Sequence, residues 1–470
     1  MIDLINSRRG YLFMICAHLV LGVAVKFAGI VVGGAYLGLF ALFTYDVFIT
    51  RDRNSRAGFY ALYIMGMEMI YRMVGAPFSW ELGKYASIII LLVGILVGRR
   101  KYTSWTFVFL LLLLIPSTFF SVGHSAERLR KMIMFNISGP VSLACSGLYF
   151  YCRPIYESDY LKQIKFSFLP AFAICAALSV TANISDLEFT NLQSNSEASG
   201  GFGANQVSTV LGWFILLGLL LKVNKTKITP YEWLDWVVIF YLLLRALLTF
   251  SRGGVMGAIL ALVGAVMVLY FSSIDFRARL KKLAPYIILG LAFLVGVFFI
   301  ANSITDGLLL FRYRGFTTIE MESGALTHSG SMLTGRGEIM KGDFQAFLDN
   351  PVWGLGLGMG EGYRAKFYGH MAAAHTEYAR LLSEHGSFGI LFMLLGMIFL
   401  PIRHFFKEKG LTARYFFVSL LLLSMFTMFH AAMRLALPGI LFGAAFMHIV
   451  PDEKDEDEED EDVEQAKLTE

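Results

Sequence analysis

Long apolar runs recur along almost the whole chain, and they constrain its fold more than any other feature. Each run is roughly 17–22 residues long, the length that an α-helix needs to cross the ~30 Å hydrocarbon core of a bilayer. Hydrophobic residues make up 56% of the 470 residues and charged residues only 16%, whereas a water-soluble domain averages about 25% charged residues. The sequence therefore predicts an all-α polytopic membrane protein with about 12–14 transmembrane helices. The runs fall near residues 10–25, 28–48, 57–75, 83–98, 104–122, 132–152, 167–182, 205–221, 233–250, 254–272, 284–302, 386–402, 414–430 and 435–450.

Lysine and arginine gather in alternate connections between these runs. Short loops on the cytoplasmic side of a membrane are enriched in these residues, so the alternation predicts that both termini are cytoplasmic. The net charge of +4 does not indicate nucleic-acid binding, because the cations are spread over short loops. The basic connections contain Arg8/Arg9, Arg51/Arg53/Arg56, Arg99/Arg100/Lys101, Arg153/Lys162/Lys165, Lys222/Lys225/Lys227, Arg277/Arg279/Lys281/Lys282 and Arg403/Lys407/Lys409/Arg414.

The opposite face receives a polar loop at 185–204 and a polar segment of about 80 residues. A structureless loop of that length is uncommon in a compact protein and is usually functional. Near-helical spacing of apolar residues predicts a helix over Gly335–Leu348 in its second half. We divide the chain into an N-terminal transmembrane bundle, central helices, the large loop, C-terminal transmembrane helices and an acidic cytoplasmic tail, at 1–204, 205–302, 303–383, 384–450 and 451–470.

Arg252 stands between two apolar runs, in the sequence Phe250-Ser251-Arg252-Gly253-Gly254. A guanidinium keeps its charge in proteins and is costly in hydrocarbon, so it must lie at a membrane face or line a hydrated cavity. An arginine beside the free N–H groups of a helix start forms a phosphate site. The alternative is an interfacial arginine that extends to lipid head groups. Arg245, two helical turns deeper, either pairs inside the bundle or extends the polar path.

The large loop contains two further candidates. Arg336 has a glycine on each side, which lets backbone N–H groups approach a ligand, and its guanidinium can bind phosphate with two hydrogen bonds. The alternative is a salt bridge to Glu338 or Asp343. His375 is the candidate general base, because an imidazole titrates near neutral pH and can take a proton from a sugar hydroxyl. Its alternative is a helix-start residue bonded to the backbone.

Other polar residues on the same face are secondary candidates. His370 and His385 rank second and third as the base. Arg128, Arg314 and Arg434 are expected to line the same cavity, although Arg128 and its neighbours could instead pair with Glu127. No cluster of metal ligands stands out, so neither a metal nor another cofactor is expected. The four cysteines lie in or beside apolar runs, which does not indicate a disulfide framework. Glu68 and Arg72, one helical turn apart, are expected to pair with each other.

Four motifs in order resemble the O-antigen ligase and polymerase superfamily, over roughly residues 200–400. An upstream glycine/asparagine motif, Gly201-Phe202-Gly203-Ala204-Asn205, is also similar to one in that family. The N-terminal half is similar only in its hydropathy. The four motifs are Leu248-Thr249-Phe250-Ser251-Arg252-Gly253-Gly254, Thr334-Gly335-Arg336, Asn350-Pro351-Val352-Trp353-Gly354-Leu355-Gly356, and His375-Thr376-Glu377-Tyr378 with Leu381, Leu382, Glu384 and Gly386.

The resemblance implies a GT-C-like, metal-independent inverting glycosyltransferase of a bacterial inner membrane. Its donor would be a glycan on undecaprenyl pyrophosphate, presented at the periplasmic face, which makes 303–383 a periplasmic loop. By motif match, Arg252 and Arg336 would hold the pyrophosphate and His375 would activate the acceptor hydroxyl. The family usually has Asn where this chain has Thr376, so an amide contact to substrate is either lost or replaced.

The resemblance leaves the acceptor open. Lipid A–core would make the protein a ligase, another lipid-linked repeat unit would make it a polymerase, and a protein hydroxyl would make it an O-oligosaccharyltransferase. A transporter or flippase of polysaccharide lipids is the competing class of function. Such a protein would carry charged residues through its spans along a central path, whereas most charges here lie in the loops. The only other partners expected are membrane lipids.

Overall fold

The structure, a computed structural model of the chain, describes residues 2–98, 104–121, 125–316, 318–322, 336–368 and 373–452. These residues form helices almost throughout, with one short pair of strands. The first half comprises η1 (Ile2–Asn6), α1 (Arg8–Phe27), α2 (Gly29–Thr50), η2 (Arg53–Ser55), α3 (Arg56–Met73), α4 (Leu82–Val97), α5 (Trp105–Leu113), η3 (Pro116–Phe120), α6 (Ala126–Phe150), β1 (Pro154–Tyr156), α7 (Glu157–Phe166), α8 (Pro170–Thr181), η4 (Ile184–Asp186) and η5 (Glu197–Ser199).

The second half begins with the long helices that carry the Ser-Arg-Gly-Gly turn. It comprises α9 (Ala204–Val223), α10 (Glu232–Leu248), α11 (Arg252–Ser272), α12 (Ile274–Ile304), α13 (Leu308–Tyr313), α14 (Thr318–Glu322), α15 (Arg336–Asp349), α16 (Gly360–Tyr368), α17 (Glu377–Phe392), η6 (Met393–Phe399, a π-helical turn), α18 (Leu400–Lys407), α19 (Leu411–Ala431), α20 (Leu437–Ala445) and β2 (His448–Val450). The helix predicted over Gly335–Leu348 is confirmed as α15.

The predicted fold class, an all-α polytopic membrane protein, is confirmed. Within the described ranges, eight helices are long and apolar enough to cross a membrane, and three shorter apolar helices accompany them. Every apolar run recognised in the sequence overlaps a helix. This agreement has a physical basis, because backbone polar groups inside hydrocarbon must be satisfied within the segment, and a helix achieves this.

Two of the apolar runs contain non-helical residues between their regular elements. The run at 104–122 is divided into α5 and η3 at Pro116, which cannot donate a backbone hydrogen bond and disfavours helical backbone before it. The run at 435–450 forms the nine-residue helix α20, followed by a turn and strand β2. Hydropathy alone does not register these interruptions, since the residues on either side of each break remain apolar.

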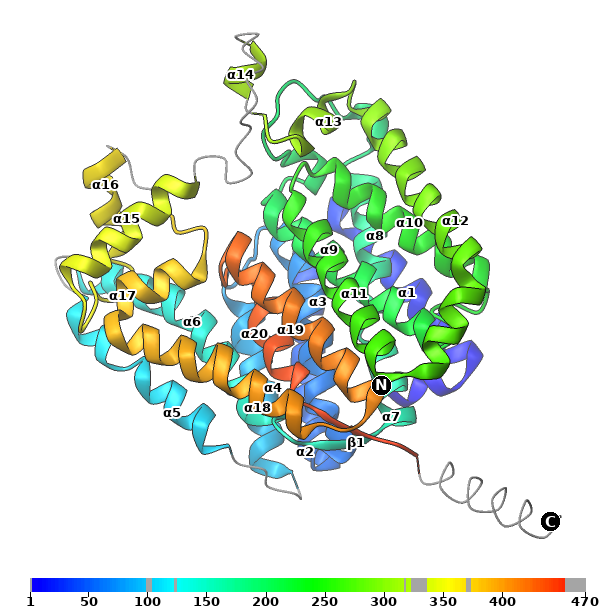
Figure 1. Cartoon of the computed structure of the whole chain (residues 1–470), viewed down its shortest axis with the longest axis horizontal. Helices are drawn as coiled ribbons and strands as arrows, with labels where there is room; N and C mark the ends of the chain where they lie inside the picture. Colours follow the sequence, from blue (N-terminus) through cyan, green and yellow to red (C-terminus); the bar gives the residue numbers. More distant parts are fainter. Residues whose placement is uncertain are drawn as a thin grey trace.

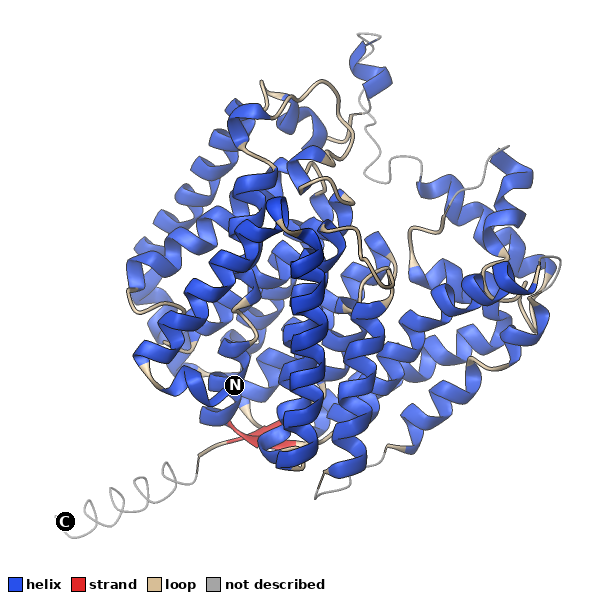
Figure 2. Cartoon of the chain, turned by 180° about the vertical axis from the view of Figure 1, so that it is seen from behind, coloured by secondary structure: helices blue, strands red, loops and turns tan. Residues whose placement is uncertain are grey.

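The bundle is built around α3, which is buried at every position from Ala57 to Arg72. A helix that is apolar on all sides belongs in the interior, and α3 packs against α4, α8, α9 and α20. Helix α11 packs between α9 and α19, and α19 in turn packs on α20. Helices α5, α6 and α17 form a layer beside this bundle, as Figures 1 and 2 show.

The two ends of the bundle differ in what they carry. The N-terminus and the β1–β2 pair lie at one end, and α13 to α16 lie toward the other (Figures 1 and 2). Strand β1 pairs in parallel with β2, with Ile155 opposite Ile449. The described C-terminal residues are thereby attached to the connection between α6 and α7.

An ion pair between Glu408 and His448 supports this attachment, with His448 Nδ1 2.6 Å from Glu408 Oε2. The hydrogen bond to Glu408 raises the pKa of His448 above 6.5. Burial alone would raise the pKa of Glu408, but hydrogen bonds from His448 and the Gly410 N–H outweigh it and hold that pKa below 4.5.

The pair should therefore stabilise the fold only over a limited range of pH. Its contribution is fully present between pH 4.5 and 6.5. It is lost as pH rises through the raised pKa of His448, and as pH falls through the lowered pKa of Glu408. We expect His448→Gln to lower stability by less than about 1 kcal/mol, because His448 is partly exposed. Melting temperatures measured across pH test this, and a difference independent of pH would contradict it.

Candidate active site

Arg252 is held at the start of α11 by a turn that is bound to α9. In this turn Phe250 has a left-handed φ of 56°. The Ser251 hydroxyl donates to Asn205 Oδ1 at 2.9 Å, and the Ser251 carbonyl accepts from Ser208 Oγ at 2.7 Å. Asn205 closes the glycine/asparagine motif recognised in the sequence, so that motif and the Ser-Arg-Gly-Gly turn are in direct contact.

Gly254 is a point of very close contact between α11 and α9. A Cβ atom at this position would lie 1.8 Å from the backbone oxygen of Ser208. Gly254→Ala should therefore push the two helices apart and lower the free energy of unfolding by at least about 1–3 kcal/mol. The melting temperature in detergent measures this change. Gly38→Ala is the matched control, because a Cβ there meets nothing within 4 Å; equal melting temperatures for the two variants would speak against the close contact.

The Arg252 guanidinium faces α13. Arg252 Nη1 donates to the carbonyl oxygen of Arg312 at 3.1 Å, and Arg312 Nε donates to the carbonyl oxygen of Phe250 at 3.1 Å. Burial raises the pKa of the neighbouring Tyr313 to about 12, although Arg252 and Arg312 act in the opposite direction. Arg252 thus joins the start of α11 to the beginning of the large polar segment.

A polar cavity of about 320 Å³ lies where the two halves of the chain meet. Its walls come from α3, the start of α4, α6, the start of α9, α16, α17 and the connection between α19 and α20. Polar residues in its lining are Arg72, Glu81, Asn136, Gln206, Glu361, Arg364, Glu377, Arg380, Glu384 and Arg434, and the aromatic ones are Trp80, Phe135 and Phe202.

Three of the four arginines in this lining are paired with buried carboxylates. The pairs are Arg72–Glu68, Arg364–Asp343 and Arg380–Glu377. The predicted pairing of Glu68 with Arg72 is therefore confirmed, at 2.6 Å. Removing one member of a buried pair leaves an uncompensated charge and destabilises a protein by about 3–5 kcal/mol. These pairs consequently fix the shape of the cavity as well as its charge.

Arg434 is the fourth arginine, and its surroundings differ. Its Nη2 donates to the backbone oxygen of Ala374 at 3.0 Å, and its own carbonyl accepts from Arg72 Nη2 at 2.9 Å. Among the described residues, no carboxylate oxygen lies within 4.0 Å of its guanidinium. Burial lowers the pKa of Arg434, Glu361 opposes that change, and a guanidinium stays charged in proteins. Arg434 therefore presents a cation that can bind an anion in the cavity.

His375 follows Ala374 in the sequence, and residues on both sides of it, Ala374 and Glu377, line the same cavity. Ala374 lines the cavity and accepts the hydrogen bond from Arg434, so the arginine binds the short segment that carries the histidine. Glu377, two residues after His375, binds Arg380 and accepts a hydrogen bond from the Met433 N–H at 3.1 Å. Glu384 also lines the cavity.

A turn of three left-handed glycines positions the helix that supplies Glu361. Gly354, Gly356 and Gly358 have φ values of 72°, 92° and 76°. A Cβ at Gly356 would lie 2.6 Å from the backbone of Phe120, so only glycine fits there. This glycine run therefore serves to pack the loop against η3 and α17.

Arg245 lies deep in the bundle at the end of α8. Its Nη2 donates to the carbonyl oxygens of Leu178 and Ala182, both at 2.8 Å. The Leu178 carbonyl also accepts from the Ala182 N–H, so Arg245 adds a second donor at the C-terminal end of α8. Of the two interpretations of Arg245 that the sequence allowed, these contacts favour pairing inside the bundle.

The remaining candidates are dispersed. Arg128 lines a neighbouring cavity of about 490 Å³ that shares Glu361 with the first. The alternative that a neighbour of Arg128 pairs with Glu127 is confirmed: Lys131 Nζ lies 2.7 Å from Glu127 Oε1. Arg314 is exposed at the end of α13.

Two predicted site residues fall outside the described part of the chain, and a third packs against another element. The side chain of Arg336 and the whole of His370 lie outside the described residues. His385 is buried in α17 with its Nδ1 2.9 Å from Ser117 Oγ. Within the described ranges, no three His, Cys, Asp or Glu side chains gather as metal ligands. Arg434 and the neighbour of His375 are thus brought together at the cavity, whereas Arg252 and Arg245 face other segments.

Two arginines of the cavity, Arg364 and Arg380, were missed by the sequence analysis. A signal for Arg380 was present, because Glu377 and Glu384 stand three residues before it and four after it on a helix that enters the bilayer. Charges at that spacing share one helix face, and within a membrane segment such a group indicates function. For Arg364 the sequence contains no comparable signal.

Comparison with known families bears on the region that surrounds this cavity. The family model described as O-Antigen ligase matches residues 237–394. This region is similar to the O-antigen ligase family. The matched region contributes α16, α17 and the His375 segment to the cavity, whereas Arg72, Gln206 and Arg434 lie outside it. No curated protein and no solved structure matches the chain.

Proposed function

We propose that the protein transfers a glycan from undecaprenyl pyrophosphate to a hydroxyl group of an acceptor. One observation carries the proposal: the cavity presents Arg434 without a carboxylate partner among the described residues, in contact with the segment that holds His375. The family match of residues 237–394 supports glycan transfer in general. Ligation and polymerisation are the two forms of the reaction that we favour.

The reaction that we propose is a single displacement with inversion. His375 takes the proton of the acceptor hydroxyl as its oxygen forms a bond to the anomeric carbon of the donor sugar. The bond between that carbon and the pyrophosphate oxygen breaks, and its electron pair leaves with undecaprenyl pyrophosphate. Arginine side chains already in place stabilise the charge that develops on the leaving oxygen.

The cavity has groups suited to both parts of such a donor. Arg434 and Arg72 would bind the pyrophosphate, since guanidinium groups match phosphate oxygens in geometry and charge. Trp80 and Phe202 stack with ring centroids 5.8 Å apart, and they offer apolar faces to a sugar ring. We propose that Arg252 and Arg336 join this arrangement when the donor is bound.

We place the site at the periplasmic face of a bacterial inner membrane, with both termini cytoplasmic. The cavity is lined by α16 and by the starts of α9 and α17, and these elements lie toward the end of the bundle away from the β1–β2 pair (Figure 1). Lysine and arginine gather in alternate connections of the sequence, as they do in cytoplasmic loops. Because guanidinium groups take up the charge of the leaving group, we expect GT-C-like catalysis that continues in EDTA.

The test is an assay of purified protein with lipid-pyrophosphate glycan and three acceptors: lipid A–core, a second lipid-linked repeat unit and a protein. Release of free undecaprenyl pyrophosphate with glycan on one acceptor supports transfer and identifies the acceptor class. Movement of intact donor across proteoliposome membranes without its cleavage would overturn transfer and favour a flippase.

A further inference from the structure

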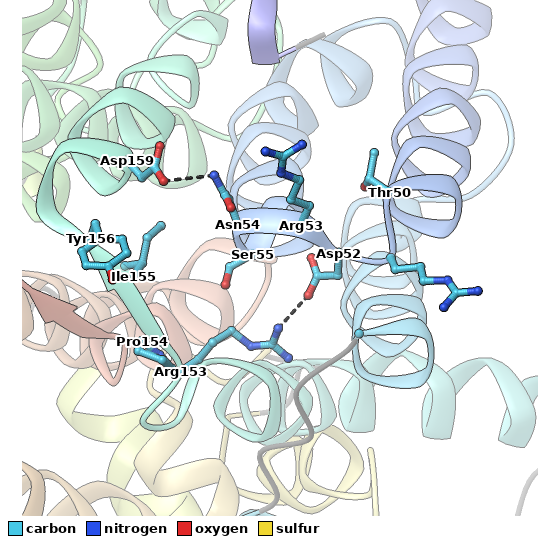
Figure 3. Close-up of a pocket in the computed structure, with 12 residues that line it drawn as sticks. Thr50, Asp52, Arg53, Asn54, Ser55, Arg153, Pro154, Ile155, Tyr156 and Asp159 are labelled. Carbon is cyan, nitrogen blue, oxygen red and sulfur yellow. Dashed lines mark hydrogen bonds and ion pairs between the residues drawn. The ribbon is translucent and has the colours of Figure 1, made fainter.

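A second polar cavity, of about 410 Å³, lies at the end of the bundle opposite the candidate active site. It is formed between the connection from α2 to α3 and the segment that contains β1 (Figure 3). Figure 3 shows Arg153 pointing toward Asp52 and Asn54 pointing toward Asp159. The proposed glycan transfer does not use this cavity.

The cavity carries more cationic than anionic groups. Arg153 is buried and pairs with Asp52 at 2.7 Å, so its charge is compensated. Asp159 accepts a hydrogen bond from Asn54 Nδ2 at 3.0 Å. Arg51 and Arg53 also line the cavity and are exposed. Among the described residues, neither has a carboxylate within 4.0 Å. Two guanidinium groups are thus available to an anion.

The backbone around these arginines is unusual. Arg51, Asp52, Asn54 and Ser55 have left-handed φ values of 51°, 53°, 55° and 58°. Such values are uncommon for residues other than glycine, and the strain persists only where the surrounding structure enforces it. The buried Asp52 does so, since it pairs with Arg153 and accepts from the Ala57 N–H at 2.9 Å. The loop that carries Arg51 and Arg53 is consequently fixed in shape.

An apolar groove of about 370 Å³ lies close to this cavity on the outer surface of the bundle. It runs between α2 and α4, and its lining is Phe40, Ala41, Thr44, Tyr45, Phe48 and Val93. Residues 41, 44, 45 and 48 follow the i, i+3, i+4 spacing of one face of α2. Phe48 lines the groove and Thr50 lines the cavity. The two residues are about 3 Å apart along the axis of α2, so the groove and the cavity adjoin.

We propose that the cavity and the groove together bind one anionic phospholipid of the cytoplasmic leaflet. Arg51 and Arg53 bind the phosphate of its head group with charge-assisted hydrogen bonds, and the groove holds an acyl chain. A soluble phosphate would use the cations alone. The adjoining groove, almost without polar lining, favours a ligand with a hydrocarbon chain.

The first test uses the protein purified in detergent and titrated with phosphatidylglycerol, with bound lipid counted by native mass spectrometry. Each cation near a membrane surface favours an anionic lipid by about 1 kcal/mol, so Arg51→Gln combined with Arg53→Gln should weaken binding by about 30-fold. The control combines Arg9→Gln with Arg403→Gln, which removes two exposed cations that do not line the cavity. Equal weakening in both double variants would overturn the proposal.

The second test addresses the groove and separates the two sources of phosphate. Ala41→Trp should fill the groove and weaken phosphatidylglycerol binding, whereas Val31→Trp, at an exposed position outside the groove lining, should not. Glycerol 3-phosphate, which has no acyl chain, should not displace the lipid. If glycerol 3-phosphate displaces the lipid at a similar concentration, the cavity binds soluble phosphates and the lipid proposal is wrong. If Ala41→Trp binds phosphatidylglycerol as tightly as the wild type, the groove does not hold the acyl chain.

Discussion

Replacing Arg434 by alanine should lower the rate of glycan transfer by about 10²–10³-fold, the loss typical of removing one preorganised donor that stabilises a developing negative charge. The expectation follows from the surroundings of Arg434. Its side chain lines the cavity and donates a hydrogen bond to the Ala374 carbonyl. Among the described residues, no carboxylate oxygen lies within 4.0 Å of its guanidinium. Release of undecaprenyl pyrophosphate in single-turnover experiments is the measurement.

Two further variants make the Arg434 prediction specific. Arg434→Lys keeps the charge but not the planar pair of donors, so it should recover part of the rate. Lys341→Ala removes an exposed cation of α15 and should leave the rate unchanged. If Arg434→Ala transfers glycan at the wild-type rate while remaining folded, the pyrophosphate is not bound at this arginine.

The other large effect is expected at His375. A positioned general base typically contributes about 10²–10⁴-fold to a rate, so His375→Ala should lower transfer by that factor. Binding of the donor should change little, because the histidine acts on the acceptor hydroxyl. The measurements are the single-turnover rate, the donor affinity and the dependence of the rate on pH.

The pH dependence distinguishes a base from a residue that only supports the loop. With His375 present, the rate should rise with pH as the imidazole loses its proton, and this rise should disappear in His375→Ala. His448→Gln, at the opposite end of the molecule, should leave the rate and its pH dependence intact. A rise in rate with pH that persists in His375→Ala would assign the base to another group.

The helices were predictable from sequence, and their breaks were less so. A membrane segment must satisfy its backbone polar groups internally, so each apolar run overlaps a helix. The break at Pro116 and the short helix at Leu437–Ala445 depend on local backbone chemistry that a hydropathy pattern averages out. The helix α15 was predicted within one residue at each end, because its apolar residues recur at helical spacing.

The composition of the cavity was predictable only in part. Arg434 and the His375 segment were recognised because charged or titratable residues stand out between apolar runs. Their neighbours were not, because Arg72 Nη2 meets the Arg434 carbonyl across 362 positions of sequence. Such a contact is decided by how α3 packs against α20, which no local pattern contains. The same holds for Arg252, whose guanidinium contacts α13.

The cavity is assembled from both sides of the family-matched region, and this limits how the protein can be engineered. Grafting residues 237–394 into another scaffold would transplant the histidine segment but leave behind Arg72, Gln206 and Arg434. A chimaera built at those borders should therefore be inactive unless its host supplies equivalent side chains. Exchanging the flanking helices while keeping the matched region intact is the more promising way to change the lining of the cavity.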